Sequence, residues 1–182
     1  MSQRAILLAV RDHLRKEMKW SELQCAVTYD GQPHPMAGEF FVAVYAGPWN
    51  GVEIEGRQDV FGVNITVSKR VTAYPGDRVD VPLAGPDGEA LDKLLDSIAA
   101  KLHMDPPAAG SSTHYPVLAL ANVTITSAAN GFITPLRLLD GGRPEPKGSD
   151  WFHADPESDV CGLAQTLTFG GAVRFQTIES QT

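Results

Sequence analysis

Residues 61–68 read Phe-Gly-Val-Asn-Ile-Thr-Val-Ser and carry the clearest secondary-structure signal in the chain. Large apolar side chains occupy every second position, and small or polar side chains occupy the positions between them. A period of two is typical of a β-strand with one face in a hydrophobic core. We therefore predict a strand here, with a buried face that other elements must cover. The apolar positions are Phe61, Val63, Ile65 and Val67.

Two further strands are predicted before this one. Residues 24–29 alternate between apolar and polar side chains, and residues 39–45 are apolar on both faces, which is typical of a central strand. Gly47-Pro48 is predicted to end the second strand and to begin a polar loop. Three adjacent strands with short connections favour an antiparallel sheet.

Two amphipathic helices are predicted to cover one face of this sheet. Ser2 is a candidate N-cap of the first helix and Asp87 of the second, because their side chains can accept hydrogen bonds from free backbone amides. The apolar positions of both helices recur at helical spacing. They are Leu7, Val10, Leu14 and Met18 in the first helix, and Leu91, Leu94, Leu95, Ile98 and Leu102 in the second.

The rest of the chain is predicted to add strands and one irregular segment. Strands are expected at residues 117–126 and 132–139, and Pro135 favours an edge or a bulge for the latter. Two C-terminal strands, at 163–169 and 172–178, are expected to be joined at Gly170-Gly171. Residues 140–160 contain six acidic and two basic residues and three prolines, which predicts an exposed acidic excursion. The expected architecture is one α+β domain over residues 1–182, with a mainly antiparallel sheet flanked by two helices.

Composition narrows the class of function. The 182 residues include 22 acidic and 15 basic side chains, a net charge of −7, which argues against a protein that grips a phosphate backbone. The sequence suggests neither a signal peptide nor a membrane span, so we expect the chain to be made in a cytoplasm. Cys25 and Cys161 are expected to be free thiols.

The best local candidate for a metal site is the group Asp150, His153 and Asp155, with Cys161 and His114 as distant additions. A carboxylate close to a histidine is expected by chance in so acidic a segment. We therefore interpret the group as a solvated loop and expect no bound metal.

The sequence lacks the common motifs of catalytic and phosphate-binding sites. The sequence contains no Gly-x-Ser-x-Gly elbow, and its glycines do not form either of the common phosphate-binding patterns. Residues 85–88 precede a helix, but the acidic side chains of Asp87 and Glu89 suit a helix start better than an anion site. We expect no catalytic residues, no cofactor and no enzymatic activity.

Aromatic residues outside the predicted strands are candidates for a subunit interface. They are Trp49 in a Gly-containing loop and Trp151-Phe152 in the acidic excursion. Such side chains either fold back onto their own core or anchor a partner. The first helix contains Arg11 and Arg15, and residues 1–20 hold five basic and two acidic side chains, which suits a solvated or subunit-facing surface.

Six features follow one another in a recognisable order. They are an N-terminal helix, residues 30–35 (Asp-Gly-Gln-Pro-His-Pro), residues 37–44 (Ala-Gly-Glu-Phe-Phe-Val-Ala-Val), the alternating strand 61–68, the leucine-rich helix 89–103, and residues 167–172 (Leu-Thr-Phe-Gly-Gly-Ala). Together they resemble the tail-completion and tail-terminator proteins of long-tailed bacteriophages. The resemblance covers about residues 1–104 and 161–178 and lies in layout rather than in an invariant motif.

The resemblance implies an α+β subunit of a structural ring, commonly a hexamer, in the tail or neck of the virion. Such a ring caps the tail tube and docks it to the head-closure or connector protein, and DNA passes through its lumen without specific binding. It implies no catalytic residues and no cofactor. Residues 106–160 depart from the pattern by their length, which leaves other neck and head-closure positions open.

Two alternatives remain open at this point. The chain can be a different phage or bacterial assembly module, or an unrecognised hydrolase or ligand-binding β-rich domain, which a deep pocket joining His114, His153 and Cys161 would favour. Within the ring interpretation, we hypothesise that Trp151 and Phe152 bury against a neighbouring copy, and that the acidic excursion meets the basic first helix there. The alternative is that Trp151 packs within its own chain.

Overall fold

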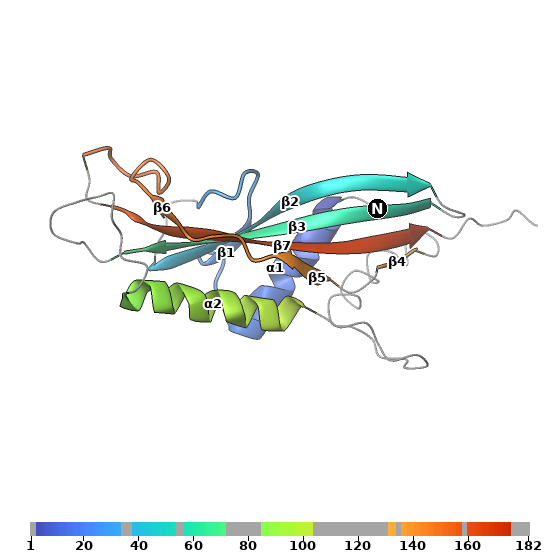
Figure 1. Ribbon diagram of the computed structural model, residues 1–182, viewed down its shortest axis with the longest axis horizontal. Coiled ribbons are helices and arrows are strands. Elements are labelled where there is room, and N and C mark those ends of the chain that lie inside the picture. Colours follow the sequence, from blue (N-terminus) through green and yellow to red (C-terminus); the bar gives the residue numbers. More distant parts are fainter. Residues whose placement is uncertain are drawn as a thin grey trace, which may run out of the picture.

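Two α-helices and a seven-stranded sheet form the part of the chain that the computed structural model describes, which is residues 3–33, 38–53, 57–71, 85–103, 131–133, 136–157 and 160–175. The helices are α1 (Gln3–Met18) and α2 (Pro86–Leu102). The strands are β1 (Cys25–Val27), β2 (Phe40–Glu53), β3 (Arg57–Arg70), β4 (Gly131–Ile133), β5 (Arg137–Asp140), β6 (Glu145–Lys147) and β7 (Gly162–Phe175). The predicted α+β class, with a mostly antiparallel sheet and two flanking helices, is confirmed (Figure 1).

The central strands follow the order β1-β2-β3-β7. β2 pairs antiparallel with β3, and β3 pairs antiparallel with β7. β1 is the exception, because it runs parallel to β2 rather than antiparallel to it. Val42 donates a backbone hydrogen bond to Gln24, and Thr28 donates one to Val44. The chain between β1 and β2 therefore returns to the starting end of β1 instead of forming a hairpin.

Contrary to the prediction, Gly47-Pro48 does not end the second strand. It forms a bulge within that strand. Ala46 pairs with Val63 and Trp49 pairs with Phe61, so two residues of β2 oppose the single residue Gly62. A Cβ on Gly47 would lie 2.8 Å from the Gly62 carbonyl carbon, which explains the glycine. A bulge also tolerates a proline, because the pairing is already interrupted there. The predicted loop that follows is instead the paired end of β2 and the start of β3.

The predicted break at Gly170-Gly171 is also wrong, since β7 continues through both glycines while paired to β3. The reason is space rather than turning. A Cβ on Gly171 would come within 2.8 Å of the Phe61 ring, and one on Gly170 would come within 2.6 Å of Leu139. Both glycines make room for neighbouring side chains.

Three short strands lie in succession along the far edge of β7. β6 pairs with residues 162–164, β5 with 168–170 and β4 with 173–175. The strand predicted over 132–139 is thus divided between β4 and β5, while Pro135 and the strand predicted at 117–126 lie outside the described residues. An edge broken into pieces this short is a poor template for further strand pairing.

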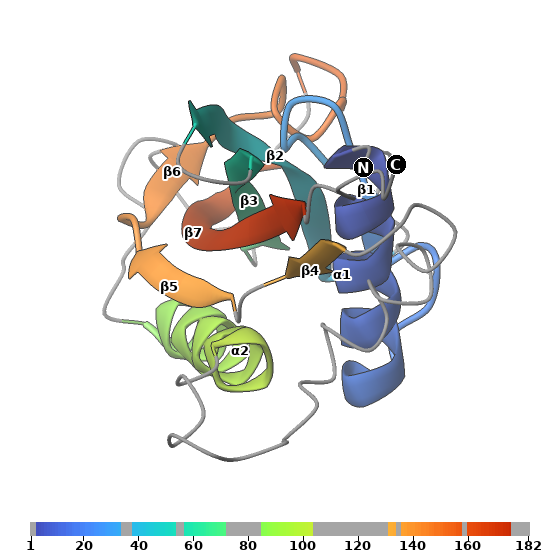
Figure 2. The same ribbon diagram turned by 90° about the vertical axis from the view of Figure 1, so that its right-hand side faces the viewer.

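Both helices cover one face of the sheet, and the main core lies between the two layers (Figure 2). The predicted alternation in β3 is confirmed, because its four apolar side chains all point into this core. Val10 and Leu14 of α1 and Ile98 and Leu102 of α2 are fully buried opposite them. Leu94, which was also expected in the core, is only partly buried against it.

The other face of the sheet carries a second, smaller core, which corrects the prediction that residues 140–160 form an irregular exposed segment. Phe152 is 2% exposed and packs with Phe41 and Ala43 of β2. The indole Nε1 of Trp151 donates a hydrogen bond to Ser68 Oγ at 3.0 Å. Gly162 has no side chain because a Cβ there would collide with the Phe152 ring. Part of the acidic segment is therefore anchored on its own sheet.

The start of α2 differs from the prediction that Asp87 caps it. The N-cap is Gly85, which offers no side-chain hydrogen bond, and Pro86 follows it in the first turn. Asp87 instead binds Lys69 Nζ at 2.9 Å, and the two side chains are only 13% and 11% exposed. This ion pair joins the first turn of α2 to the end of β3. The candidate cap Ser2 lies outside the described residues.

Candidate functional site

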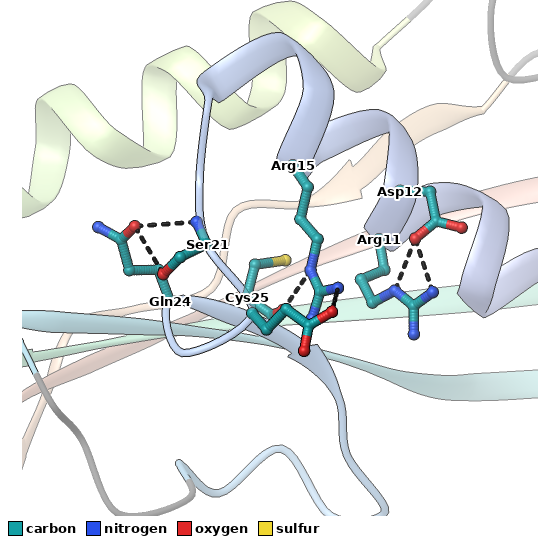
Figure 3. A network of polar contacts seen from close by, with 7 residues as sticks. Arg11, Asp12, Arg15, Ser21, Gln24 and Cys25 are labelled. Carbon is teal, nitrogen blue, oxygen red and sulfur yellow. Dashed lines mark hydrogen bonds and ion pairs between the residues drawn. The ribbon is translucent and has the colours of Figure 1, made fainter.

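Arg11 and Arg15 of α1, two of the predicted interface residues, make contacts within their own chain (Figure 3). Arg15 Nε donates to the Cys25 carbonyl oxygen at 2.8 Å, and its guanidinium lies 3.6 Å from Glu22. Arg11 pairs with the neighbouring Asp12 at 2.6 Å. Arg15 therefore ties α1 to β1. The role of both residues at a subunit interface stays a prediction.

The three aromatic candidates have different positions. Trp49 belongs to β2, but its side chain lies outside the described part of the chain. Trp151 is half-buried, with Lys147 Nζ 4.5 Å from its ring centroid. Phe152 is buried within its own chain, which favours the intrachain alternative for this residue.

The candidate metal ligands occupy a tight turn. His153 N donates to the Asp150 carbonyl at 3.2 Å, and Asp155 Oδ1 accepts from the Glu157 amide at 3.0 Å. Within the described ranges, no group of three or more His, Cys, Asp or Glu side chains could hold a metal ion. His114 lies outside those ranges, and so does any pocket that would join it to His153 and Cys161.

The two cysteines are free, and they differ in environment. Cys25 is fully buried beneath α1, and burial raises the pKa of its thiol to about 12. Cys161 is half-buried next to β7. Since the thiolate is the reactive species, Cys25 is chemically inert near neutral pH.

We expect Cys25 in the folded protein to react with a thiol reagent at pH 8 roughly 10³-fold more slowly than a thiol of ordinary pKa. The pKa of a free thiol is about 8.5, so the folded state keeps Cys25 protonated at a pH where an unfolded chain is partly ionised. Mass spectrometry after timed labelling of a Cys161→Ser variant measures this rate. Labelling of Cys25 as fast in native as in denaturing buffer would contradict the burial.

A polar pocket of about 180 Å³ opens on the sheet face opposite the helices. Hydroxyl side chains of β3 and β7 line its floor. Thr66 Oγ1 and Thr166 Oγ1 are 2.6 Å apart, and Thr168 Oγ1 donates to Asn64 Oδ1 at 3.1 Å. These pairs face each other because the strands are in register at Asn64–Thr168 and at Thr66–Thr166.

The rim of the pocket is the arc from Asp140 to Lys147. Asp140 Oδ1 accepts from the Gly142 amide at 2.8 Å, and Gly142 has a φ of +62° and passes so close to Thr166 that a Cβ would collide with the Thr166 carbonyl oxygen. Lys147 binds Glu145 at 2.6 Å, and this hydrogen bond lowers the pKa of the Glu145 carboxyl. Arg143 is exposed and forms no ion pair with any described residue.

The lining offers hydroxyl groups, two cations and two carboxylates, but no histidine or cysteine. Such a set suits the recognition of a group that both donates and accepts hydrogen bonds. Sequence reasoning missed this pocket. Its only local signal is the alternation of polar side chains in β3 (Asn64, Thr66 and Ser68) and of threonines in β7 (Thr166 and Thr168), and those strands are about a hundred residues apart.

Large exposed apolar side chains are few among the described residues, namely Leu23, Tyr29 and Leu139, which are 62%, 100% and 68% exposed. Leu23 and Tyr29 lie just before and just after β1, at one edge of the sheet. Leu139 lies in β5, at the opposite edge. Exposed apolar groups are thus present at both edges.

Comparison with known proteins gives no family, since no family model and no curated protein matches the chain. Neither α1 nor α2 is long and apolar enough to cross a membrane.

Proposed function

We propose that this chain is a structural subunit of a ring at the head–tail junction of a long-tailed bacteriophage, in the position of a tail terminator or tail-completion protein. The proposal begins from the sequence resemblance, which implies an α+β subunit. The observed order α1-β1-β2-β3-α2, with both helices on one face of the sheet, agrees with that expectation.

The observation that carries the proposal is the difference in charge between two surfaces of the subunit. Figure 2 shows α1 and β1 on one side of the central strands, and β5 and β6 on the other. Residues 3–20 contain five basic and two acidic side chains, whereas residues 140–157 contain two basic and five acidic ones. The acidic segment begins at the β7 edge and continues over the sheet face opposite the helices, where Phe152 packs on Phe41 and Ala43 of β2. Unlike patches on different surfaces of one subunit allow a heterologous contact, which is the kind that closes into a ring.

The net charge of −7 also suits a ring through which DNA slides. Repeated around an axis, acidic subunits create a negative potential that repels phosphate groups and prevents tight binding. The same reasoning applies to a head-closure or another neck ring, and this is the alternative position. The tail tube protein and the head-closure or connector protein are the axial partners that the proposal implies.

Electron microscopy of virions tests the proposal. With an epitope tag on this chain, gold-labelled antibody is expected at the junction between head and tail. A virus that lacks the gene is expected to produce filled heads without joined tails. Unlabelled virions, together with normal particles from the deletion, would reject a neck function, and label elsewhere on the particle would reassign it.

A further inference from the structure

We propose that Tyr29 of one subunit docks into the polar pocket between Thr66, Thr166 and Arg143 of the next copy, so that an exposed side chain on the β1 side of the sheet meets a pocket on the β7 side. This inference rests on the proposed ring, since it names the contact between its subunits. The partner is a second copy of this chain.

The turn that contains Tyr29 holds its side chain in solvent. Its side chain is 100% exposed, although the backbone around it is firmly bonded. Gly31 N donates to Thr28 Oγ1, and Gln32 N donates to Asp30 Oδ1, both at 3.0 Å. Gly31 has a φ of +81°, and a Cβ there would collide with the ring of Tyr45. A rigid turn that presents a bare tyrosine loses little entropy on binding, as is typical of an interface anchor.

The pocket matches a tyrosine in size and chemistry. Its volume is about 180 Å³, and a cavity of roughly 150 Å³ is large enough for benzene. Thr66 Oγ1 donates to the Tyr45 hydroxyl at 3.2 Å and lies 2.6 Å from Thr166 Oγ1, so the Thr166 hydroxyl on the floor keeps a lone pair that can accept from a phenol hydroxyl. Arg143 on the rim is exposed and can lie over an aromatic ring, and its charge complements that of Asp30 beside Tyr29.

Leu139 of β5 provides an exposed apolar side chain at the edge of the sheet next to the pocket. β5 pairs with β7 at Leu138 and Asp140, and Leu139 is the extra residue of a bulge between them. The bulge leaves the side chain 68% exposed, leaning over Gly170. A bulge that re-aims one side chain outward is a usual device at functional edges. The exposed apolar groups of the two edges, Leu23 with Tyr29 and Leu139, can then be buried by one contact.

The positions of Tyr29 and of the polar pocket decide the type of assembly. Tyr29 follows β1, and Gly31 of the same turn lies against Tyr45 of β2 and Thr66 of β3 on the sheet face that also carries the pocket. The pocket rim joins β5 to β6, which lie on the opposite side of the central strands from β1 (Figure 2). A contact between two different patches is heterologous. An open chain of copies therefore has an undocked Tyr29 at one end and an empty pocket at the other until a ring closes.

Self-association of the purified chain, measured by mass photometry and sedimentation, tests this contact. Tyr29→Ala and Arg143→Ala are each expected to raise the dissociation constant about thirtyfold, the scale of an interface hot spot. Arg137→Ala, which removes an exposed arginine of β5 outside the pocket lining, is the matched control and should associate as the wild type does. Circular dichroism verifies that each variant is folded.

Mixing the variants gives a second measurement. The Tyr29→Ala variant keeps an intact pocket, and the Arg143→Ala variant keeps Tyr29. A mixture of the two should therefore form pairs at a protein concentration at which each variant alone is monomeric. Wild-type affinity in Tyr29→Ala, or a wild-type chain that stays monomeric at the highest attainable concentration, would overturn the contact. Labelling at the virion neck would still support the proposed function in either case, so the two failures are distinguishable.

Discussion

Replacement of Phe152 by alanine is expected to lower the free energy of unfolding by about 3–5 kcal/mol, the usual range for a fully buried phenylalanine. The ring is 2% exposed, packs on Phe41 and Ala43, and fills the space that Gly162 leaves open. Denaturant titration of the isolated chain measures the loss. The effect should be present in the monomer, because every contact that produces it lies within one chain.

Tyr29→Ala is the matched control for this change, since it removes an aromatic ring that is fully exposed. Its effect on the free energy of unfolding should stay within about 0.5 kcal/mol, as for other surface substitutions. The two variants thus separate stability from assembly. A loss below about 1 kcal/mol for Phe152→Ala would show that the ring is not packed on its own sheet, and would favour the earlier hypothesis that it anchors a neighbouring copy.

Ile65→Ala is expected to cost about 2–5 kcal/mol, because it removes a fully buried side chain from the middle of β3 and leaves a cavity beneath the helices. Ile65 lies between Val44 of β2 and Leu167 of β7 in register, so the surrounding strands cannot easily close the gap. The midpoint of denaturant unfolding should fall while its slope stays unchanged.

Leu23→Ala provides the corresponding control, because Leu23 is 62% exposed and loses little contact on truncation. Its unfolding midpoint should stay close to that of the wild type. An Ile65→Ala variant that is as stable as Leu23→Ala would mean that the apolar side chains of β3 do not face the main core.

The residues of the helices and of β3 could be predicted because their signal is local. The leucine spacing of α2 and the alternation from Phe61 to Val67 each need only one segment of chain, and burial in the structure follows both patterns. The absence of a local catalytic or phosphate-binding motif was likewise visible in the sequence. Each of these features depends on neighbours within a few positions.

The glycine and proline signals failed for the opposite reason. Gly47-Pro48 and Gly170-Gly171 look like turns when only the chain itself is considered. Their glycines instead make room for Gly62, Phe61 and Leu139, which approach from other strands. Asp87 was similarly expected to bind its own helix, but Lys69 of β3 lies within 2.9 Å of it.

The candidate site was out of reach of the sequence, since its parts come together only through the pairing of β3 with β7 and the fold of residues 140–152 over that pair. The amino-acid sequence by itself determined which residues prefer helix or strand and which faces are apolar, because these preferences arise from backbone geometry and from local periodicity. Only the tertiary structure decided that β1 runs parallel to β2, that Phe152 is buried, and that Tyr29 is left exposed. Those outcomes depend on contacts between segments that are distant in the chain, and such contacts leave no periodic trace in either segment alone.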